Sequence, residues 1–191
     1  RWAASADLLL AADAGVDRLR AIGRKPHVLI GDMDSAVATD HAESIECDAD
    51  QESTDCDKLL ARAELRGLTS ITLACVEGDQ LDHMLATLHS ALRSPLDVRF
   101  ALRTGVGWAL TPGERRVIPS TPGRRVSLIP VLPSSATLGG VVWPLSATKL
   151  APLGPTSISN EAASDAIEVS LQSGAAFLFV EFPWTELPFW D

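Results

Sequence analysis

The run VLIGDMDS, residues 28–35, sets the expected architecture of the first half of the chain. Its aliphatic start predicts a buried strand, which ends at Gly31 where the acids begin. Side chains two residues apart on an extended chain point the same way, so Asp32 and Asp34 can both reach one hard cation such as Mg2+. A capped turn or a solvated loop would use the same residues, so this pattern alone leaves the three alternatives open.

Strands and helices alternate on both sides of this run. Apolar runs predict strands at residues 8–12 and 71–76, and helical spacing predicts helices at 16–22, 54–66 and 81–92. This alternation is typical of a mostly parallel sheet with helices on both faces. We therefore expect a three-layer α/β domain over residues 1–95.

The pattern changes near residue 96, where helical spacing fades and short β-rich runs are separated by Gly and Pro. These runs predict strands at residues 98–102, 107–110, 126–131, 141–143, 166–171 and 176–182. Such short strands with regular turns indicate an antiparallel β-sandwich over residues 96–191. The expected fold class is thus α/β followed by all-β.

Charge and composition restrict the possible partners. The chain has 191 residues and a net charge of −9, whereas nucleic acid binding needs clustered bases, so we expect no nucleic acid partner. The only local excess of base, at Arg115, Arg116, Arg124 and Arg125, is expected to be a solvated face. No apolar run approaches the roughly 18 residues that a membrane helix needs, so we expect no membrane contact.

The cysteines point to a reducing compartment. There are three, without a CxxC pair, which disfavours a disulfide framework and predicts a cytoplasmic protein. Cys56 and Cys75 are expected to be small core residues rather than nucleophiles.

Acids follow each of the predicted strands of the first half, at Asp13, at Asp32 and Asp34, and between Glu77 and Asp82. Ligands of open parallel sheets bind outside the carboxyl ends of the strands. This recurrence makes those ends the expected place of the chemistry.

Two further segments each allow a structural and a functional interpretation. Between residues 50 and 58, the acids suit the start of a helix, but Thr54, Asp55 and Lys58 together could also hold phosphates and a metal. Between residues 78 and 83, Asp82 could cap a helix beside a surface His83, or both could face a nucleotide.

Taken together, these segments resemble the thiamine pyrophosphokinase family. The family pattern has an Asp-Gly-Gly turn, a Gly-Asp-x-Asp-Ser strand end, a Gln…Thr-Asp…Lys helix start, a Gly-Gly-Arg-x-Asp-His turn, a Gly-x-x-Trp-x-Leu stretch and a Ser-Asn pair. The matching segments are, in order, residues 13–15, 31–35, 51–58, 78–83, 140–145 and 159–161.

The resemblance implies transfer of the pyrophosphoryl group of ATP to the hydroxyl of thiamine, with Mg2+, by a homodimer whose active site lies between subunits. It implies a catalytic, metal-holding set formed by Asp32, Asp34 and Asp55. It implies ATP contacts from Asp13, Gln51, Thr54, Lys58, Asp82 and His83. It implies a thiamine pocket lined by Trp143, Ser159 and Asn160, although by itself Trp143 would suit a sandwich core.

Two departures from the family pattern motivate alternatives. Ala14 replaces the first Gly of the Asp-Gly-Gly turn, and Asp79-Gln80 replaces Gly-Arg, which removes a cation. A binding module without turnover is one alternative. A related diphosphokinase acting on a pterin alcohol is another, which Trp143 and the Ser159-Asn160 pair disfavour.

Overall fold

The structure is a computed structural model that describes residues 3, 6–12, 15–31, 42–47, 50, 52–78 and 80–183. The chain divides into two compact units. Unit 1 comprises residues 1–71, 78–96 and 189–191, and unit 2 comprises residues 72–77 and 97–188. Within the described residues, no helix has the length and apolar character needed to cross a membrane.

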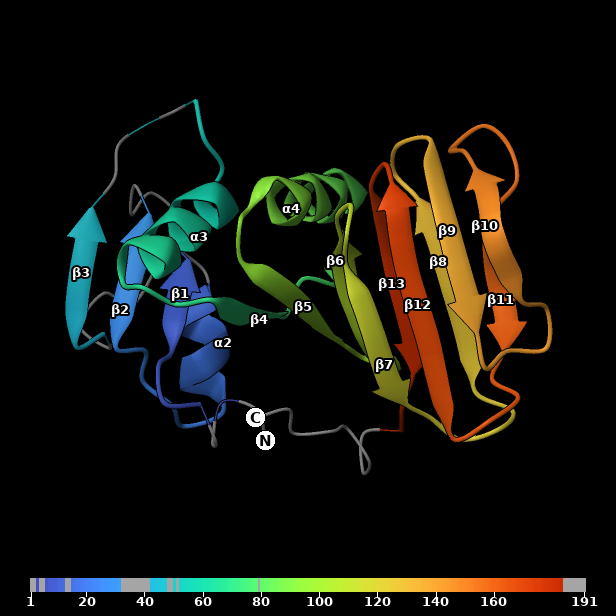
Figure 1. The fold of residues 1–191 in the computed structure, drawn as a ribbon. Helices are drawn as coiled ribbons and strands as arrows, with labels where there is room; N and C mark the ends of the chain where they lie inside the picture. Colours follow the sequence, from blue (N-terminus) through green and yellow to red (C-terminus); the bar gives the residue numbers. More distant parts are fainter. Residues whose placement is uncertain are drawn as a thin grey trace. The chain divides into compact units, whose positions relative to one another are not determined.

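Unit 1 contains a three-stranded parallel sheet in the order β1-β2-β3 (Figure 1). Its elements are β1 (Leu10–Ala12), α2 (Gly15–Ala21), β2 (Val28–Gly31), β3 (Ser44–Cys47), α3 (Asp55–Leu65) and α4 (Leu81–Arg93). All four residues of β2 are buried, as befits the central strand of a covered parallel sheet. Helix α3 packs on β1 and β2, and α2 packs on β1. The expected buried strand before Asp32 is therefore confirmed.

The third parallel strand differs from the expectation. The apolar run at 71–76 does form a strand, β4 (Ser70–Ala74), but β4 lies at the edge of a six-stranded sheet rather than in the parallel sheet. The strand beside β2 is β3, whose Ile45 is half exposed. An edge strand buries little apolar surface, so its sequence contains no continuous run of apolar residues that would indicate a strand.

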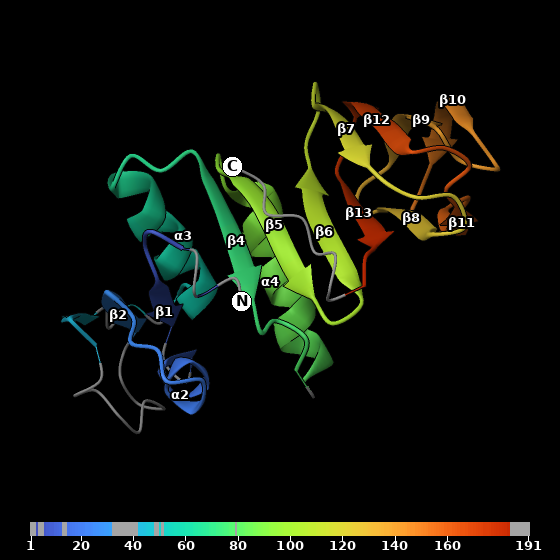
Figure 2. The same cartoon turned by 90° about the horizontal axis from the view of Figure 1, so that it is seen from below.

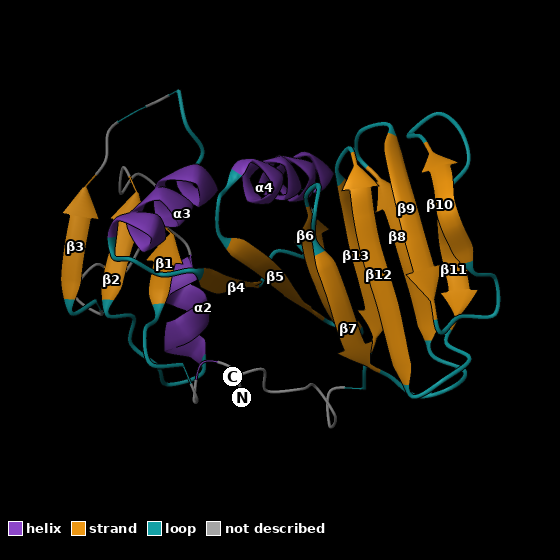
Figure 3. Ribbon diagram, viewed as in Figure 1, coloured by secondary structure: helices purple, strands orange, loops and turns teal. Residues whose placement is uncertain are grey.

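The strands from β5 to β13, all in unit 2, pair antiparallel in two sheets, and all three helices named above belong to unit 1 (Figure 3). The strand orders are β10-β9-β12-β7 and β11-β8-β13-β6-β5-β4. Figure 2 shows the four-stranded sheet stacked over β13, β8 and β11. The strands are β5 (Asp97–Leu102), β6 (Gly105–Leu110), β7 (Arg115–Pro119), β8 (Arg125–Pro130), β9 (Ser134–Gly139), β10 (Leu145–Leu150), β11 (Ser157–Glu161), β12 (Ala166–Ser173) and β13 (Ala176–Glu181).

The two sheets of unit 2 bury alternate residues. Ile167, Val169 and Leu171 of β12 are buried, as are Leu178 and Val180 of β13. This period of two is the pattern of strands that turn one face to a sandwich core. The predicted antiparallel sandwich is confirmed, but residues 141–143 are not a strand: they form a connection after β9 with a single bridge from Val141 to Ala162.

Gly107 allows two aromatic rings to meet across β6. The rings of Phe100 and Phe177 lie edge to face, with centroids 5.5 Å apart. A Cβ on Gly107 would lie 2.4 Å from the Phe177 ring and 3.3 Å from Phe100. A side chain at this position would therefore displace Phe177 from its place over the strand.

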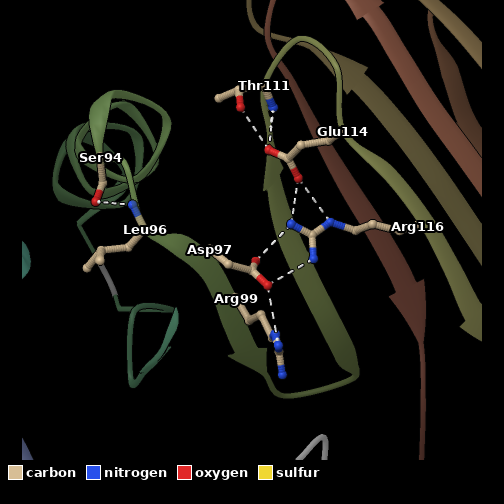
Figure 4. A network of polar contacts seen from close by, with 7 residues as sticks. All are labelled: Ser94, Leu96, Asp97, Arg99, Thr111, Glu114 and Arg116. Carbon is tan, nitrogen blue, oxygen red and sulfur yellow. Dashed lines mark hydrogen bonds and ion pairs between the residues drawn. The ribbon is translucent and has the colours of Figure 1, made fainter. Parts of the chain in front are cut away.

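A network of ion pairs connects β5 to β7 (Figure 4). The Arg116 guanidinium donates to both Asp97 carboxylate oxygens, at 2.8 and 3.1 Å, and also to Glu114. Glu114 in turn accepts from the backbone N–H and hydroxyl of Thr111, both at 2.8 Å. The expectation that Arg116 belongs to a solvated face is wrong, since its side chain is only 19% exposed.

Asp97 is held as a carboxylate by this network. Burial raises its pKa, but hydrogen bonds and charges from Arg116 and Arg99 outweigh that effect and leave the pKa below the ordinary 3.8. Asp97 and Arg116 lie on strands of different sheets. The network therefore joins the two sheets of unit 2 at β5 and β7.

Candidate active site

Helix α3 starts with a capping box. Thr54 is the N-cap, in an extended conformation, and its hydroxyl accepts from the Asp57 backbone N–H at 3.1 Å. The Asp57 carboxylate accepts in return from the Thr54 backbone N–H at 3.0 Å and from its hydroxyl at 2.7 Å. The structural interpretation of these two residues is therefore correct, because they satisfy backbone donors that the first helical turn leaves open.

Helix α4 reinforces the same turn. Arg93 donates to Asp57 at 2.7 Å, and the Ser90 hydroxyl lies 3.4 Å from that of Thr54. Burial raises the pKa of Asp57, but hydrogen bonds from Thr54, Arg93 and Ser90 outweigh it and lower the pKa to about 2. The first turn of α3 is thus fixed by the last turn of α4.

Replacing Thr54 by alanine is expected to lower the free energy of unfolding by about 1 kcal/mol, because the N-cap acceptor is lost. Thr54→Ser keeps the hydroxyl and should stay within about 0.5 kcal/mol of the wild type. Urea denaturation followed by circular dichroism measures both variants. Equal stability of all three proteins would contradict the capping role.

Asp55 and Lys58 form the second feature of this turn. The Lys58 side chain is buried, at 5% exposure for the residue, and its Nζ lies 3.8 Å from an Asp55 carboxylate oxygen. The Asp55 side chain is 40% exposed. A carboxylate open to solvent beside a buried ammonium, at the positive end of a helix, can bind a cation together with phosphate oxygens.

The first turn of α4 carries Asp82 and His83, both exposed. The N-cap of α4 is Gln80, and among the described residues no side chain makes a capping hydrogen bond to this helix. Asp82 therefore lies inside the helix and does not cap it. Both side chains are accessible to a ligand.

Four of the site residues expected from the sequence, Asp13, Asp32, Asp34 and Gln51, lie outside the described residues, as do Ala14 and Asp79. Of the remaining ATP and metal candidates, Thr54, Asp55 and Lys58 share the start of α3. Among the side chains that the structure describes, no three His, Cys, Asp or Glu residues gather as a metal site. The convergence of the three aspartates on one cation stays a prediction.

Trp143 is not a core residue. It lies between β9 and β10, and it is 61% exposed, so the alternative of a sandwich core for Trp143 is wrong. Asn160 of β11 is buried, and its side chain bonds the backbone of Trp143. Ser159 is exposed and has a φ of 54°, next to an irregularity in the pairing of β11 with β8. The three residues of the expected thiamine pocket are therefore brought together in unit 2.

The two described cysteine side chains differ. Cys56 is partly buried, and burial is the main cause that raises the pKa of its thiol to about 12. It is therefore no nucleophile near neutral pH. Cys75 is exposed, contrary to the expectation of a core residue, because it follows the end of an edge strand.

Sequence reasoning missed Ser90 and Arg93. A base in the last turn of a helix is common on dipole grounds alone, so Arg93 gives no sign that it pairs with Asp57, 36 positions away. Ser90 and Arg93 are three residues apart, so they lie on one face of α4. That shared face was the signal in the sequence that both could contact the same partner.

Comparison with protein families gives two matches. The family model described as "Thiamin pyrophosphokinase, catalytic domain" matches residues 1–101, which is more than half of the chain, and the one described as "Thiamin pyrophosphokinase, vitamin B1 binding domain" matches residues 115–176. The chain belongs to the thiamin pyrophosphokinase family. Its activity is accordingly that of an ATP-dependent diphosphotransferase acting on thiamine.

Solved structures of thiamin pyrophosphokinases share the fold. Thiamine pyrophosphokinase from Bacillus subtilis has 22% identity and a TM-score of 0.79, over 94% of this chain and 91% of that chain. Thiamin pyrophosphokinase from Candida albicans has 15% identity and a TM-score of 0.79, over 94% and 82%. A family protein from Enterococcus faecalis has 19% identity and a TM-score of 0.79, over 94% and 91%. Comparison with curated protein sequences gave no significant match.

Proposed function

We propose that this thiamin pyrophosphokinase binds the ATP phosphates and Mg2+ at the start of α3, and thiamine at Trp143. The observation that carries the first part is the pairing of a half-exposed Asp55 carboxylate with a buried Lys58 ammonium, 3.8 Å apart. The Asp55 side chain is 40% exposed, against 24% for that of Asp57, which Thr54 and Arg93 engage, so a ligand reaches Asp55 more readily.

The residues fit the metal that the family implies. Mg2+ prefers a few carboxylate oxygens together with phosphate and water oxygens, and Asp55 offers such an oxygen, with Asp32 and Asp34 as its proposed companions. When bound, Mg2+ would neutralise charge on the transferred phosphates.

The protein's own residues supply positioning and charge. Lys58, at the helix start, favours an anion such as a phosphate oxygen at this place. Asp82 and His83, on the first turn of α4, are proposed to contact ATP, as are Asp13, Gln51 and Thr54. Because Thr54 already makes the capping bonds, its contribution to ATP binding is chiefly to hold Asp55 and Lys58 in place.

Trp143 is proposed to pack on a ring of thiamine. A cation over an indole face is stabilised by about 0.5–2 kcal/mol, and the thiazolium ring of thiamine is a cation. Ser159 and Asn160 are proposed to belong to the same site.

The test of this function is a reaction with ATP, thiamine and Mg2+, resolved by chromatography. AMP and thiamine diphosphate should form in equal amounts, and chelation of Mg2+ should stop both. Release of ADP would contradict diphosphate transfer, and ATP binding without AMP would indicate a module without turnover. Replacement of thiamine by hydroxymethylpterin should give no product.

We further propose that the protein is a cytoplasmic homodimer. The family resemblance supports the dimer, and the cysteine pattern supports the compartment. Light scattering after size-exclusion chromatography should give twice the chain mass of 20.3 kDa, and a mass of one chain would contradict the dimer.

A further inference from the structure

The backbone around Trp143 is fixed although its side chain is exposed. Residues 140–142 run beside residues 161–163: Ala163 donates to the Gly140 carbonyl and Val142 donates to the Glu161 carbonyl, both at 2.8 Å. At Trp143, the next residue, the main chain bonds to a side chain instead of to another main-chain group. The Trp143 N–H donates to Asn160 Oδ1 at 3.1 Å, and Asn160 Nδ2 donates to the Trp143 carbonyl at 2.7 Å.

The amide of Asn160 has little capacity left for a ligand. Its oxygen also accepts from the Glu161 N–H at 2.8 Å, and its nitrogen also donates to the Ser157 hydroxyl at 3.2 Å. An Asn side chain offers two donors and two acceptor positions, and all four are used. The residue is 3% exposed, so its buried polar atoms are satisfied without any ligand.

An irregularity in β11 creates this arrangement. The pairing of β11 with β8 shifts between Ser157 and Asn160, and Ser159 takes a φ of 54°. Strained residues of this kind persist when the surroundings over-determine them, and they cluster at functional sites. Here the backbone turn directs the Asn160 side chain inward, to the main chain of Trp143.

We propose that Asn160 is a positioning residue that acts on thiamine only through Trp143, by holding the backbone from which the indole projects. The inference rests on the proposed function, in which Trp143 packs on thiamine. Fixing an aromatic side chain before binding removes part of the ordering cost that binding would otherwise carry. Direct contact of the Asn160 amide with thiamine would require breaking one of its four bonds.

A double-mutant cycle of Asn160→Ala and Trp143→Ala, with steady-state kinetics, tests this proposal. Asn160→Ala should raise KM for thiamine about tenfold and leave KM for ATP unchanged. In the Trp143→Ala background, the same change should alter KM for thiamine less than about twofold. Full additivity of the two losses would overturn the proposal, because it would mean that Asn160 acts independently of Trp143.

Two further variants separate this role from general stability. Ser157→Ala removes only the fourth bond of Asn160 and should leave KM for thiamine unchanged. Asn160→Asp is isosteric, keeps both acceptor bonds and loses the donor to the Trp143 carbonyl, so it should raise KM for thiamine as well. It takes the place of Asn160→Ala in the cycle should that variant not fold, and a wild-type KM for Asn160→Asp would count against the proposal.

A measurement without thiamine separates the inference from the proposed function. In time-resolved fluorescence anisotropy, comparison with matched Trp143→Phe proteins isolates the Trp143 signal. Its fast local motion should increase in Asn160→Ala, and unchanged motion would overturn the positioning role. Greater motion with unchanged KM for thiamine would also overturn it, whereas a wild-type protein that makes no thiamine diphosphate would refute the proposed function instead.

Discussion

Asp55→Asn is expected to reduce the formation of AMP and thiamine diphosphate at least about a hundredfold. An amide has the shape of the carboxylate but lacks the negative charge that a divalent cation requires. The half-exposed Asp55 takes no part in the capping box, but its charge pairs with the buried Lys58 ammonium, so the free energy of unfolding should fall by about 1–2 kcal/mol, no more than in the control below. Initial rates at saturating ATP and thiamine, together with urea denaturation, measure the two effects.

Asp57→Asn is the matched control, two positions further along the same helix. It weakens the bonds to Thr54 and Arg93, so it should lower the free energy of unfolding by about 1–2 kcal/mol and affect the rate less than Asp55→Asn does.

The pKa of Asp57 is about 2 in the folded protein, below the ordinary value. Its contribution is therefore complete above about pH 5 and is lost as the pH falls toward 2. Full activity of Asp55→Asn would refute the metal-holding role.

Arg116→Ala is expected to lower the free energy of unfolding by about 3 kcal/mol at pH 7. The change leaves the Asp97 and Glu114 carboxylates near one another without their shared cation, in a place where all three side chains are largely covered. Denaturant unfolding monitored by circular dichroism measures the loss. The denaturant concentration at the unfolding midpoint should fall, while the dependence of the free energy on denaturant concentration should stay the same.

The loss caused by Arg116→Ala should shrink at low pH. The pKa of Asp97 lies below the ordinary value in the folded wild type, so the network stabilises the fold above that value and ceases to do so as the pH falls through the folded pKa. The difference between wild type and variant should be largest at pH 6–8 and should decrease as the pH falls below the ordinary 3.8 of Asp97. A difference independent of pH would mean that lost packing of the arginine stem, not charge, is the cause.

Arg115→Ala is the control for the preceding residue. Its side chain is 73% exposed and reaches Glu168, which is also exposed. Exposed pairs of this kind contribute about 0–1 kcal/mol. Equal destabilisation by Arg115→Ala and Arg116→Ala would show that any substitution at the start of β7 disturbs the sandwich.

The sequence predicted those parts of the fold whose periodicity is strong. The all-buried β2 and the alternating β12 and β13 are evident from their apolar residues alone. The edge strand β3 was missed because half-exposed residues such as Ile45 give no continuous run. The pairing of β4 could not be predicted, since an apolar run indicates a strand but does not specify its neighbour.

The sequence also identified the residue types of the site better than their connections. Thr54, Asp55 and Lys58 do share one helix start, but it took the structure to assign capping to Asp57 and exposure to Asp55. Asn160 was assigned to the thiamine pocket, whereas its bonds run to the backbone of Trp143. Such long-range pairs depend on the packing of distant segments, which no local pattern contains.

The contact of Phe177 with the bare backbone of Gly107 restricts how this chain can change. Any larger residue at 107 meets the ring at 2.4 Å, while a smaller residue at 177 leaves a void against Phe100. Each change alone is therefore costly, yet a larger side chain at 107 with a smaller one at 177 can refill the same volume. In a random mutagenesis library selected for folded protein, substitutions at 107 and 177 should be recovered together in the same variant and rarely alone.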